Sequence, residues 1–164
     1  MNELEFQTEY HRRLFEIQRL CEEEPQIELP LSHQFAPGVY LRTIFMPKGT
    51  FVIGKKHKTE HFNIVLTGSA NVLIEGELRG IKAPSIFVSP PGSKKVLNIL
   101  EDMLWATVHP TDETDMDELE KMMVCTPEEE KQLISEEVRH ALRNEERNEE
   151  RIKEGIEKGN QERG

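Results

Sequence analysis

Hydrophobic side chains change their spacing twice along this chain of 164 residues. Residues 3–23 place apolar side chains mostly three or four positions apart, and Pro25, which lacks an amide hydrogen, ends that pattern. Residues 27–109 instead contain short runs of β-branched and aromatic side chains between turn residues. The pattern therefore predicts an N-terminal amphipathic helix followed by the many short strands of a sandwich or barrel.

Turn residues mark where the predicted strands end. The expected strands are residues 39–45, 62–66, 70–74, 78–81, 86–88, 96–100 and 104–108. Thr67-Gly68-Ser69 predicts a hairpin and Glu75-Gly76-Glu77 predicts a turn, because glycine adopts the backbone conformations that tight turns need. The middle of the chain is therefore predicted to be mainly β.

Helical periodicity returns in the last third of the chain. Residues 116–123 predict a short amphipathic helix that begins behind acidic side chains. Thr126-Pro127-Glu128-Glu129 predicts a second start, with a Thr cap, Pro at the first helical position and a Glu that completes a capping box. The apolar stripe of that helix covers residues 133–142, and the repeat of Arg, Asn and Glu beyond it predicts a solvated charged helix.

These patterns predict three parts. Residues 1–25 form an amphipathic helix, residues 26–110 form the strand region, and residues 111–164 form a helical extension with a charged tail. The apolar faces of the helices must cover either the strand region or another subunit, and we expect a homo-oligomer. The expected oligomer contacts are Leu14, Ile17, Leu133, Ile134 and Val138.

Composition narrows the classes of partner. The net charge of −10 argues against binding to nucleic acid, because no basic face offsets repulsion by the phosphates. No apolar run approaches the roughly 20 residues that span a bilayer, and the N-terminus lacks the features of a signal peptide. Two cysteines without a disulfide spacing fit a reducing compartment. We expect a soluble protein, made in the cytoplasm, with protein or small-molecule partners.

Two spacings in the middle of the chain resemble the two sequence motifs of cupins. The first cupin motif is a glycine, five residues, His-x-His, three or four residues, Glu, six residues and a glycine. Its positions fall here on Gly49, Lys55, His57, His61 and Gly68. The second motif falls on Pro84, Pro90, Gly92, Lys95 and Ile99. The resemblance implies a cupin-like antiparallel β-barrel, or jelly roll, with an N-terminal helix and a C-terminal helical extension.

The resemblance also implies that the usual metal site of the family is altered. Metal-dependent cupins use three histidines and a glutamate, and the matching residues here include Lys55 and Lys95. Ammonium groups offer no lone pair and repel a cation, so no cofactor is expected. A divalent metal remains the alternative if His109 joins His57 and His61 as a third imidazole ligand.

The same side chains allow two further interpretations. The histidines can form a structural polar cluster, bonded to Asn63 or to the backbone. Alternatively, lysines beside imidazoles favour an anionic ligand such as a carboxylate or a phosphate, unless the lysines lie on a solvated rim. The candidate pocket residues are Lys55, His57, His61, Asn63, Lys95, Trp105 and His109.

Several strings resemble small cupin-like proteins of tailed bacteriophages. These are residues 57–65, 82–90, 105–110 and 111–117. The resemblance favours a non-enzymatic protein that acts in assembly, as a virion structural or morphogenesis component. Other phage or host proteins would then be its partners, in the host cytoplasm and in the virion. The alternatives are a metal-dependent or sugar-modifying cupin enzyme, and a binding module that sequesters an anionic metabolite or a signalling nucleotide.

Overall fold

The computed structural model describes residues 1–161, so the end of the predicted charged tail, residues 162–164, lies outside the described residues. The chain divides into two compact units. The strand unit is Gln26–Glu130, and the helical unit combines Met1–Pro25 with the chain from Lys131 onward. The division into three parts remains a prediction. In the described part of the chain, no helix has both the length and the apolar character needed to cross a membrane.

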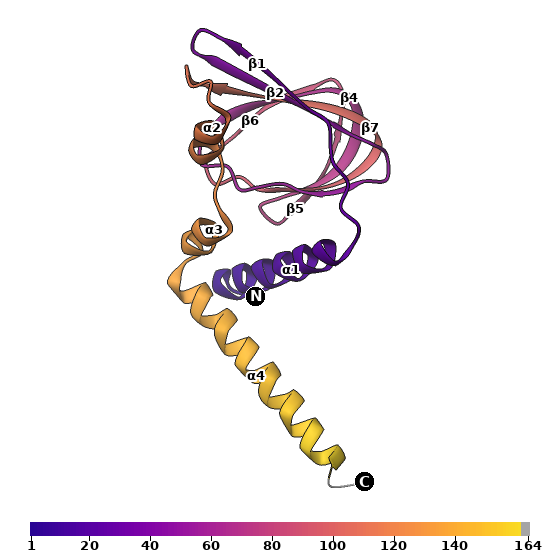
Figure 1. Cartoon of the computed structure of the whole chain (residues 1–164). Helices are drawn as coiled ribbons and strands as arrows, with labels where there is room; N and C mark the ends of the chain where they lie inside the picture. Colours follow the sequence, from indigo (N-terminus) through magenta and orange to yellow (C-terminus); the bar gives the residue numbers. More distant parts are fainter. Residues whose placement is uncertain (162–164) are drawn as a thin grey trace. The chain divides into compact units, whose positions relative to one another are not determined.

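Seven strands form the sheet of the strand unit (Figure 1). They are β1 (Leu31–Ala36), β2 (Val39–Met46), β3 (Phe51–Ile53), β4 (His61–Ile74), β5 (Glu77–Lys82), β6 (Ser85–Ser89) and β7 (Lys95–Pro110). All of their pairings are antiparallel. The predicted mainly β, cupin-like jelly roll is confirmed, although the hydrogen-bonded ladder of the described strands stays open and does not close into a ring.

Two long strands connect the layers of this jelly roll. The first half of β4 pairs with β6 and with the end of β7, which also pairs with β2. The second half of β4 pairs with β5 and with the start of β7, which also pairs with β3. One layer is therefore β1-β2-β7-β4-β6 and the other is β3-β7-β4-β5. Side chains from both layers form the main hydrophobic cluster, which includes Val65 and Trp105 from one and Val72 and Ile99 from the other.

The hairpin predicted at Thr67-Gly68-Ser69 is wrong, because β4 runs without a break from His61 to Ile74. Gly68 has a φ of 82° and lies where the register between β4 and β7 shifts. A Cβ on this residue would lie 2.3 Å from the carbonyl oxygen of Asp102 on β7. The glycine therefore forms a bulge that carries the strand from one layer to the other.

Of two further predictions for the strand unit, one is wrong and one is confirmed. The separate strands predicted at residues 96–100 and 104–108 are a single strand, β7. The turn predicted around Gly76 is confirmed, because Glu75 and Gly76 both have a positive φ between β4 and β5.

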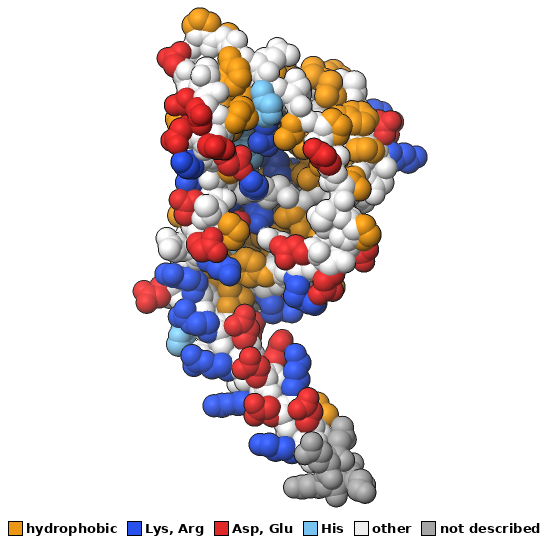
Figure 2. All heavy atoms as spheres, viewed as in Figure 1, with side chains coloured by type: hydrophobic (Ala, Val, Ile, Leu, Met, Phe, Trp, Pro, Cys, Tyr) orange, Lys and Arg blue, Asp and Glu red, His pale blue; other side chains and the backbone are white. Residues whose placement is uncertain are grey.

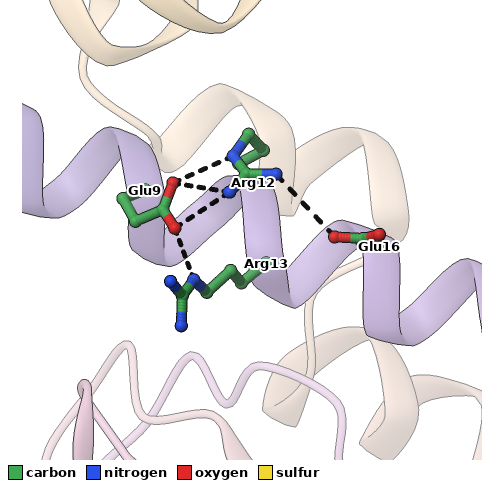
Figure 3. A network of polar contacts seen from close by, with 4 residues as sticks. All are labelled: Glu9, Arg12, Arg13 and Glu16. Carbon is green, nitrogen blue, oxygen red and sulfur yellow. Dashed lines mark hydrogen bonds and ion pairs between the residues drawn. The ribbon is translucent and has the colours of Figure 1, made fainter.

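The N-terminal helix follows its prediction closely. Helix α1 (Glu3–Glu23) begins with a capping box between Asn2 and Glu5 and ends just before Pro25. Figure 3 shows a cluster of charges on this helix, in which Glu9 accepts hydrogen bonds from Arg12 at 2.7 Å and from Arg13. These bonds lower the pKa of the Glu9 carboxyl. Such solvated pairs support the helix only weakly.

The C-terminal helices differ from the prediction in one break. Helix α2 (Met116–Met123) has the predicted bounds, and Thr126 and Glu129 form the predicted capping box of α3 (Pro127–Leu133). The predicted helix is interrupted after Leu133, and a new helix, α4 (Glu136–Gln161), follows. Ser135 accounts for the restart, because its hydroxyl accepts a hydrogen bond from the amide of Val138, as an N-cap does.

Within the helical unit, α1 and α4 pack against each other. Three of the five expected oligomer contacts, Leu14, Ile134 and Val138, are buried within the single chain. Ile17 is partly buried, and Leu133 is 60% exposed. Burial of the first three needs no second subunit, and the homo-oligomer remains a prediction. Charged side chains cover the far part of α4 (Figure 2), as expected for a solvated helix.

Candidate functional site

One end of the first layer carries a polar inner face. Successive rows of cross-strand neighbours point to the same side, because side chains alternate along each strand. The first row contains Tyr40, His109, His61 and Ser89, the second contains Arg42, Thr107, Asn63 and Phe87, and the third contains Ile44, Trp105 and Val65. The inner face therefore changes from polar at this end to apolar toward the core.

Three imidazoles meet at the polar end. His57 lies in the loop between β3 and β4, His61 begins β4, and His109 lies near the end of β7. The ring centroids of His57 and His61 are 4.3 Å apart, and those of His61 and His109 are 5.0 Å apart. His61 and His109 are each only 2% exposed. The structure thus brings together the three histidines that the sequence selected.

Each of the two most buried histidines has one nitrogen without a partner. Nδ1 of His61 lies 2.9 Å from the carbonyl oxygen of Thr59, which can only accept, so Nδ1 carries the proton. Nε2 of His109 lies 3.0 Å from the hydroxyl of Thr107. Within the described residues, Nε2 of His61 and Nδ1 of His109 are buried and have no hydrogen-bond partner. Unsatisfied buried polar atoms are rare because they cost free energy, so these two indicate a ligand.

Burial keeps these imidazoles neutral. Burial lowers the pKa of His57 to about 3 and that of His109 to about 4. It also lowers the pKa of His61. The positive charge of Arg42 lowers the pKa of all three, and that of Lys95 lowers the pKa of His57 and His61. The cluster is therefore a region of positive potential, in a chain whose net charge is −10.

The other predicted pocket residues divide into two groups. Lys95 is 7% exposed, donates a hydrogen bond to the hydroxyl of Ser93 at 3.3 Å, and has its pKa lowered by burial to about 8. Lys55 does not join the cluster, since its side chain is 65% exposed and its ammonium pairs with Glu120 of α2. Of the two lysines at cupin ligand positions, only Lys95 is therefore buried near the imidazoles.

Asn63 and Trp105 form a buried hydrogen-bonded pair beneath the histidines. The indole nitrogen of Trp105 donates to the Asn63 side-chain oxygen at 3.1 Å, and the Asn63 amide donates to the Ser89 hydroxyl at 2.8 Å. The Asn63 amide also lies 3.5 Å from the carbonyl oxygen of Phe87, so its partners in the described structure are these three residues and not the imidazoles that the sequence suggested. The pair closes the floor of the polar cluster.

Tyr40 and Arg42 on β2 also belong to the cluster, although the sequence did not point to them. Tyr40 is fully buried, its ring stacks on His109 with centroids 5.8 Å apart, and its hydroxyl lies 2.7 Å from Nδ1 of His33. Arg42 occupies the next inward position, opposite Thr107. Alternation along residues 39–45 places both side chains on one face, but nothing local in the sequence says that this face turns inward.

A later segment of the chain holds the loop that carries His57. We call residues 116–130 the clamp segment. The amide of Lys58 donates to the carbonyl of Met123 at 2.7 Å, and a β-bridge joins His57 to Val124. Two ion pairs reinforce this contact, Lys55–Glu120 and Lys58–Glu129 at 2.9 Å, and a third, Lys94–Glu130 at 2.7 Å, joins the clamp segment to the loop between β6 and β7. Leu119 and Met123 also pack in one cluster with Tyr40. The clamp segment therefore fixes one wall of the site.

Figure 2 shows Lys and Arg side chains, drawn in blue, around a hollow in the strand unit. As arranged, this donor set does not fit a divalent cation. The ring centroids of His57 and His61 are 4.3 Å apart with the planes tilted by 35°, and Lys95 and Arg42 add positive charge that repels a cation. Within residues 1–161, no group of three His, Cys, Asp or Glu side chains has the arrangement of a metal site.

Solved structures that this chain resembles include the EutQ protein of Clostridium difficile, with 18% identity, 52% of this chain and 70% of that chain covered, and a TM-score of 0.43. KdgF from Halomonas sp. has 20% identity, 58% and 93% coverage, and a TM-score of 0.47. A cupin superfamily protein from Desulfitobacterium hafniense has 10% identity, 55% and 84% coverage, and a TM-score of 0.46.

The likeness to cupins concerns the fold alone. No protein-family model matches this chain. No curated protein matches it either. The resemblance to bacteriophage proteins, and the location in host cytoplasm or virion, therefore remain predictions. What the site binds must be argued from its own side chains.

Proposed function

We propose that this cupin-like protein binds a small anionic molecule, carrying a carboxylate or a phosphate, in the cluster of His57, His61, His109, Arg42 and Lys95. The observation that carries the proposal is a pair of buried imidazole nitrogens that lack a partner among the described residues and lie near two cations. An anion would accept hydrogen bonds from Arg42 and Lys95 and balance their charge, and Nε2 of His61, which carries a lone pair in the neutral ring, would donate to the anion once that ring takes up a proton.

Charge at the site supports an anion over a neutral ligand. Apart from the hydrogen bond of His61 to Thr59, every influence that shifts the pKa values of the three histidines disfavours a further positive charge. An anion beside the rings would raise those pKa values again. Binding would then be accompanied by proton uptake, and the affinity would increase as the pH falls from 7 toward 5, a range in which the low pKa values of His57 and His109 keep these two rings of the free site neutral.

Thermal unfolding with a panel of inorganic phosphate, citrate, sugar phosphates and nucleotides tests the proposal. A ligand at 100 times its Kd would stabilise the protein by about 2.7 kcal/mol. Arg42→Gln should abolish that stabilisation, whereas Arg79→Gln on β5, which removes an exposed guanidinium paired with Glu77, should not. Failure of the whole panel to stabilise the protein, or equal stabilisation of the Arg42 variant, would contradict the proposal.

A second candidate function is assembly, as a bacteriophage virion or morphogenesis component made of copies of this chain. The outer face of β2, β4 and β6 supports it. Five large apolar side chains on this face are exposed: Phe45 (37%), Phe62 (53%), Leu66 (49%), Ile86 (71%) and Val88 (48%). They expose on the order of 450 Å², which suits the apolar centre of an interface that buries about 800 Å² per partner.

Light scattering on the full chain tests this assembly. If the outer face joins two copies, Phe62→Asp and Ile86→Asp should each convert the oligomer to a monomer. Leu78→Asp is the matched control, because Leu78 is 73% exposed on β5, in the other layer. A wild-type monomer at high concentration would exclude the assembly, and mass spectrometry of purified phage particles would test the virion location.

A further inference from the structure

Two adjacent lysines of the strand unit have the same exposure but different surroundings. The side chains of Lys94 and Lys95 are each 7% exposed. The ammonium of Lys94 pairs with the Glu130 carboxylate at 2.7 Å. Lys95 forms no ion pair with any residue that the structure describes, and its hydrogen bond goes to the neutral hydroxyl of Ser93 at 3.3 Å. A buried ammonium with only a hydroxyl partner is costly, so the site raises the share of the free amine at this position, although the ammonium stays the major form at pH 7.

The free amine is the nucleophilic form of lysine. Burial lowers the pKa of Lys95 to about 8, and the carboxylate of Glu75 offsets this only in part. At pH 7 about a tenth of the Lys95 side chains would then be free amines, against fewer than about one in a thousand for an ordinary lysine. Desolvation beside other cations is a known way to activate a lysine toward carbonyl groups.

The neighbours of Lys95 supply what such chemistry needs. His57 and His61 lie close enough to Lys95 for its charge to lower their pKa values, and both rings are neutral. A neutral imidazole can accept a proton and return it. Arg42, on the second row of the inner face, can hold an anionic group of the same molecule.

We propose that Lys95 forms a reversible imine with a small carbonyl compound that also carries a carboxylate or a phosphate, such as a 2-oxo acid. This inference rests on the proposed anion site. The amine nitrogen attacks the carbonyl carbon, a C–N bond forms, and the carbonyl electron pair moves to oxygen. An imidazole carries two protons in succession from the nitrogen to that oxygen: the first gives a hydroxyl group, and with the second the oxygen leaves as water when the C=N bond forms. The step needs no oxidant or reductant.

Reductive trapping on the full chain tests this inference. Pyruvate with sodium cyanoborohydride at pH 7 should convert the imine to a stable secondary amine, located by peptide mass spectrometry. We expect labelling of Lys95 to exceed that of Lys94 by about tenfold or more, because of these two buried lysines Lys94 is held as an ammonium by the Glu130 carboxylate. Acetone, which has a carbonyl but no anionic group, should label Lys95 much less.

The outcomes separate the two proposals. Lactate has the carboxylate without the ketone, so stabilisation by lactate and pyruvate with no adduct on Lys95 would overturn the imine and leave the anion site intact. Absence of both stabilisation and adduct would overturn both proposals. Lys95→Arg should remove the adduct while it retains the charge, and Lys94→Arg should leave the adduct in place. Labelling spread evenly over exposed lysines would also overturn the inference. This measurement uses the wild-type protein, so it does not depend on whether the variants fold.

Discussion

Among the glycines of the strand unit, Gly68 should be the one that tolerates substitution by a residue with a side chain least. In Gly68→Ala, the new Cβ would lie 2.3 Å from the carbonyl oxygen of Asp102, closer than Cβ atoms approach other atoms, and the obstacle is the backbone of β7. The residue also has a φ of 82°, a left-handed conformation that costs an alanine about 1–2 kcal/mol. Displacement of β7 by the new Cβ costs further free energy. Together the two effects should lower the free energy of unfolding by about 3–5 kcal/mol.

Two other glycines separate the contributions. Gly38 has a φ of 74° but open space around its Cβ position, so Gly38→Ala should cost only the conformational part, about 1–2 kcal/mol. Gly80 lies in β5 with open space and without a left-handed φ, so Gly80→Ala should be neutral or slightly stabilising. Urea unfolding of the three variants gives the free energies. If Gly68→Ala is no less stable than Gly38→Ala, Gly68 does not serve as the close-packed bulge between the layers.

Three further predictions concern the site. Asn63→Leu should lower the free energy of unfolding by about 1–3 kcal/mol and shift the fluorescence of Trp105, the single tryptophan, because the indole N–H loses its acceptor; an unchanged spectrum and stability would disprove this pairing. Burial lowers the pKa of His109 from 6.5 to about 4, so the unfolded chain takes up this proton first. The folded state should therefore lose about 1.4 kcal/mol per pH unit as the pH falls from 6.5 toward 4, and His109→Asn should reduce that slope in urea unfolding. An identical slope in the variant would contradict the cause. Glu130→Gln should lower the free energy of unfolding by about 2–4 kcal/mol and Glu120→Gln by less than about 1 kcal/mol in the same assay. The reason is burial: the side chains of the Lys94–Glu130 pair are 7% and 15% exposed, and those of the Lys55–Glu120 pair are 65% and 43% exposed. Equal losses in the two variants would refute this distinction.

Features set by neighbouring residues could be predicted from the sequence. The bounds of α1, the capping box at Thr126 and the turn at Gly76 follow from side chains that act within a few positions. The role of Gly68 could not be predicted in this way. A hairpin and a bulge both need a positive φ, and pairing with β7, more than thirty residues later, selects the bulge.

The site shows the same division between local and distant information. Motif spacing selected His57 and His61, the sequence offered His109 as a third imidazole, and the structure brings the three rings together. Lys55 and Lys95 occupy equivalent ligand positions, yet only a distant partner tells them apart, because Glu120 draws Lys55 to the surface. The inward direction of Arg42 depends on the pairing of β2 with β7, which the sequence does not encode locally.

The sharing of β4 and β7 by both layers limits how the jelly roll can move. Two sheets that are held together by side chains alone can separate along one edge. Here β4 and β7 are continuous through both layers, so the layers cannot separate without breaking strand pairing. A ligand must therefore enter between the loops at the end of the jelly roll, and not by separation of the two layers. Amide hydrogen exchange should accordingly report one cooperative opening for both halves of each long strand.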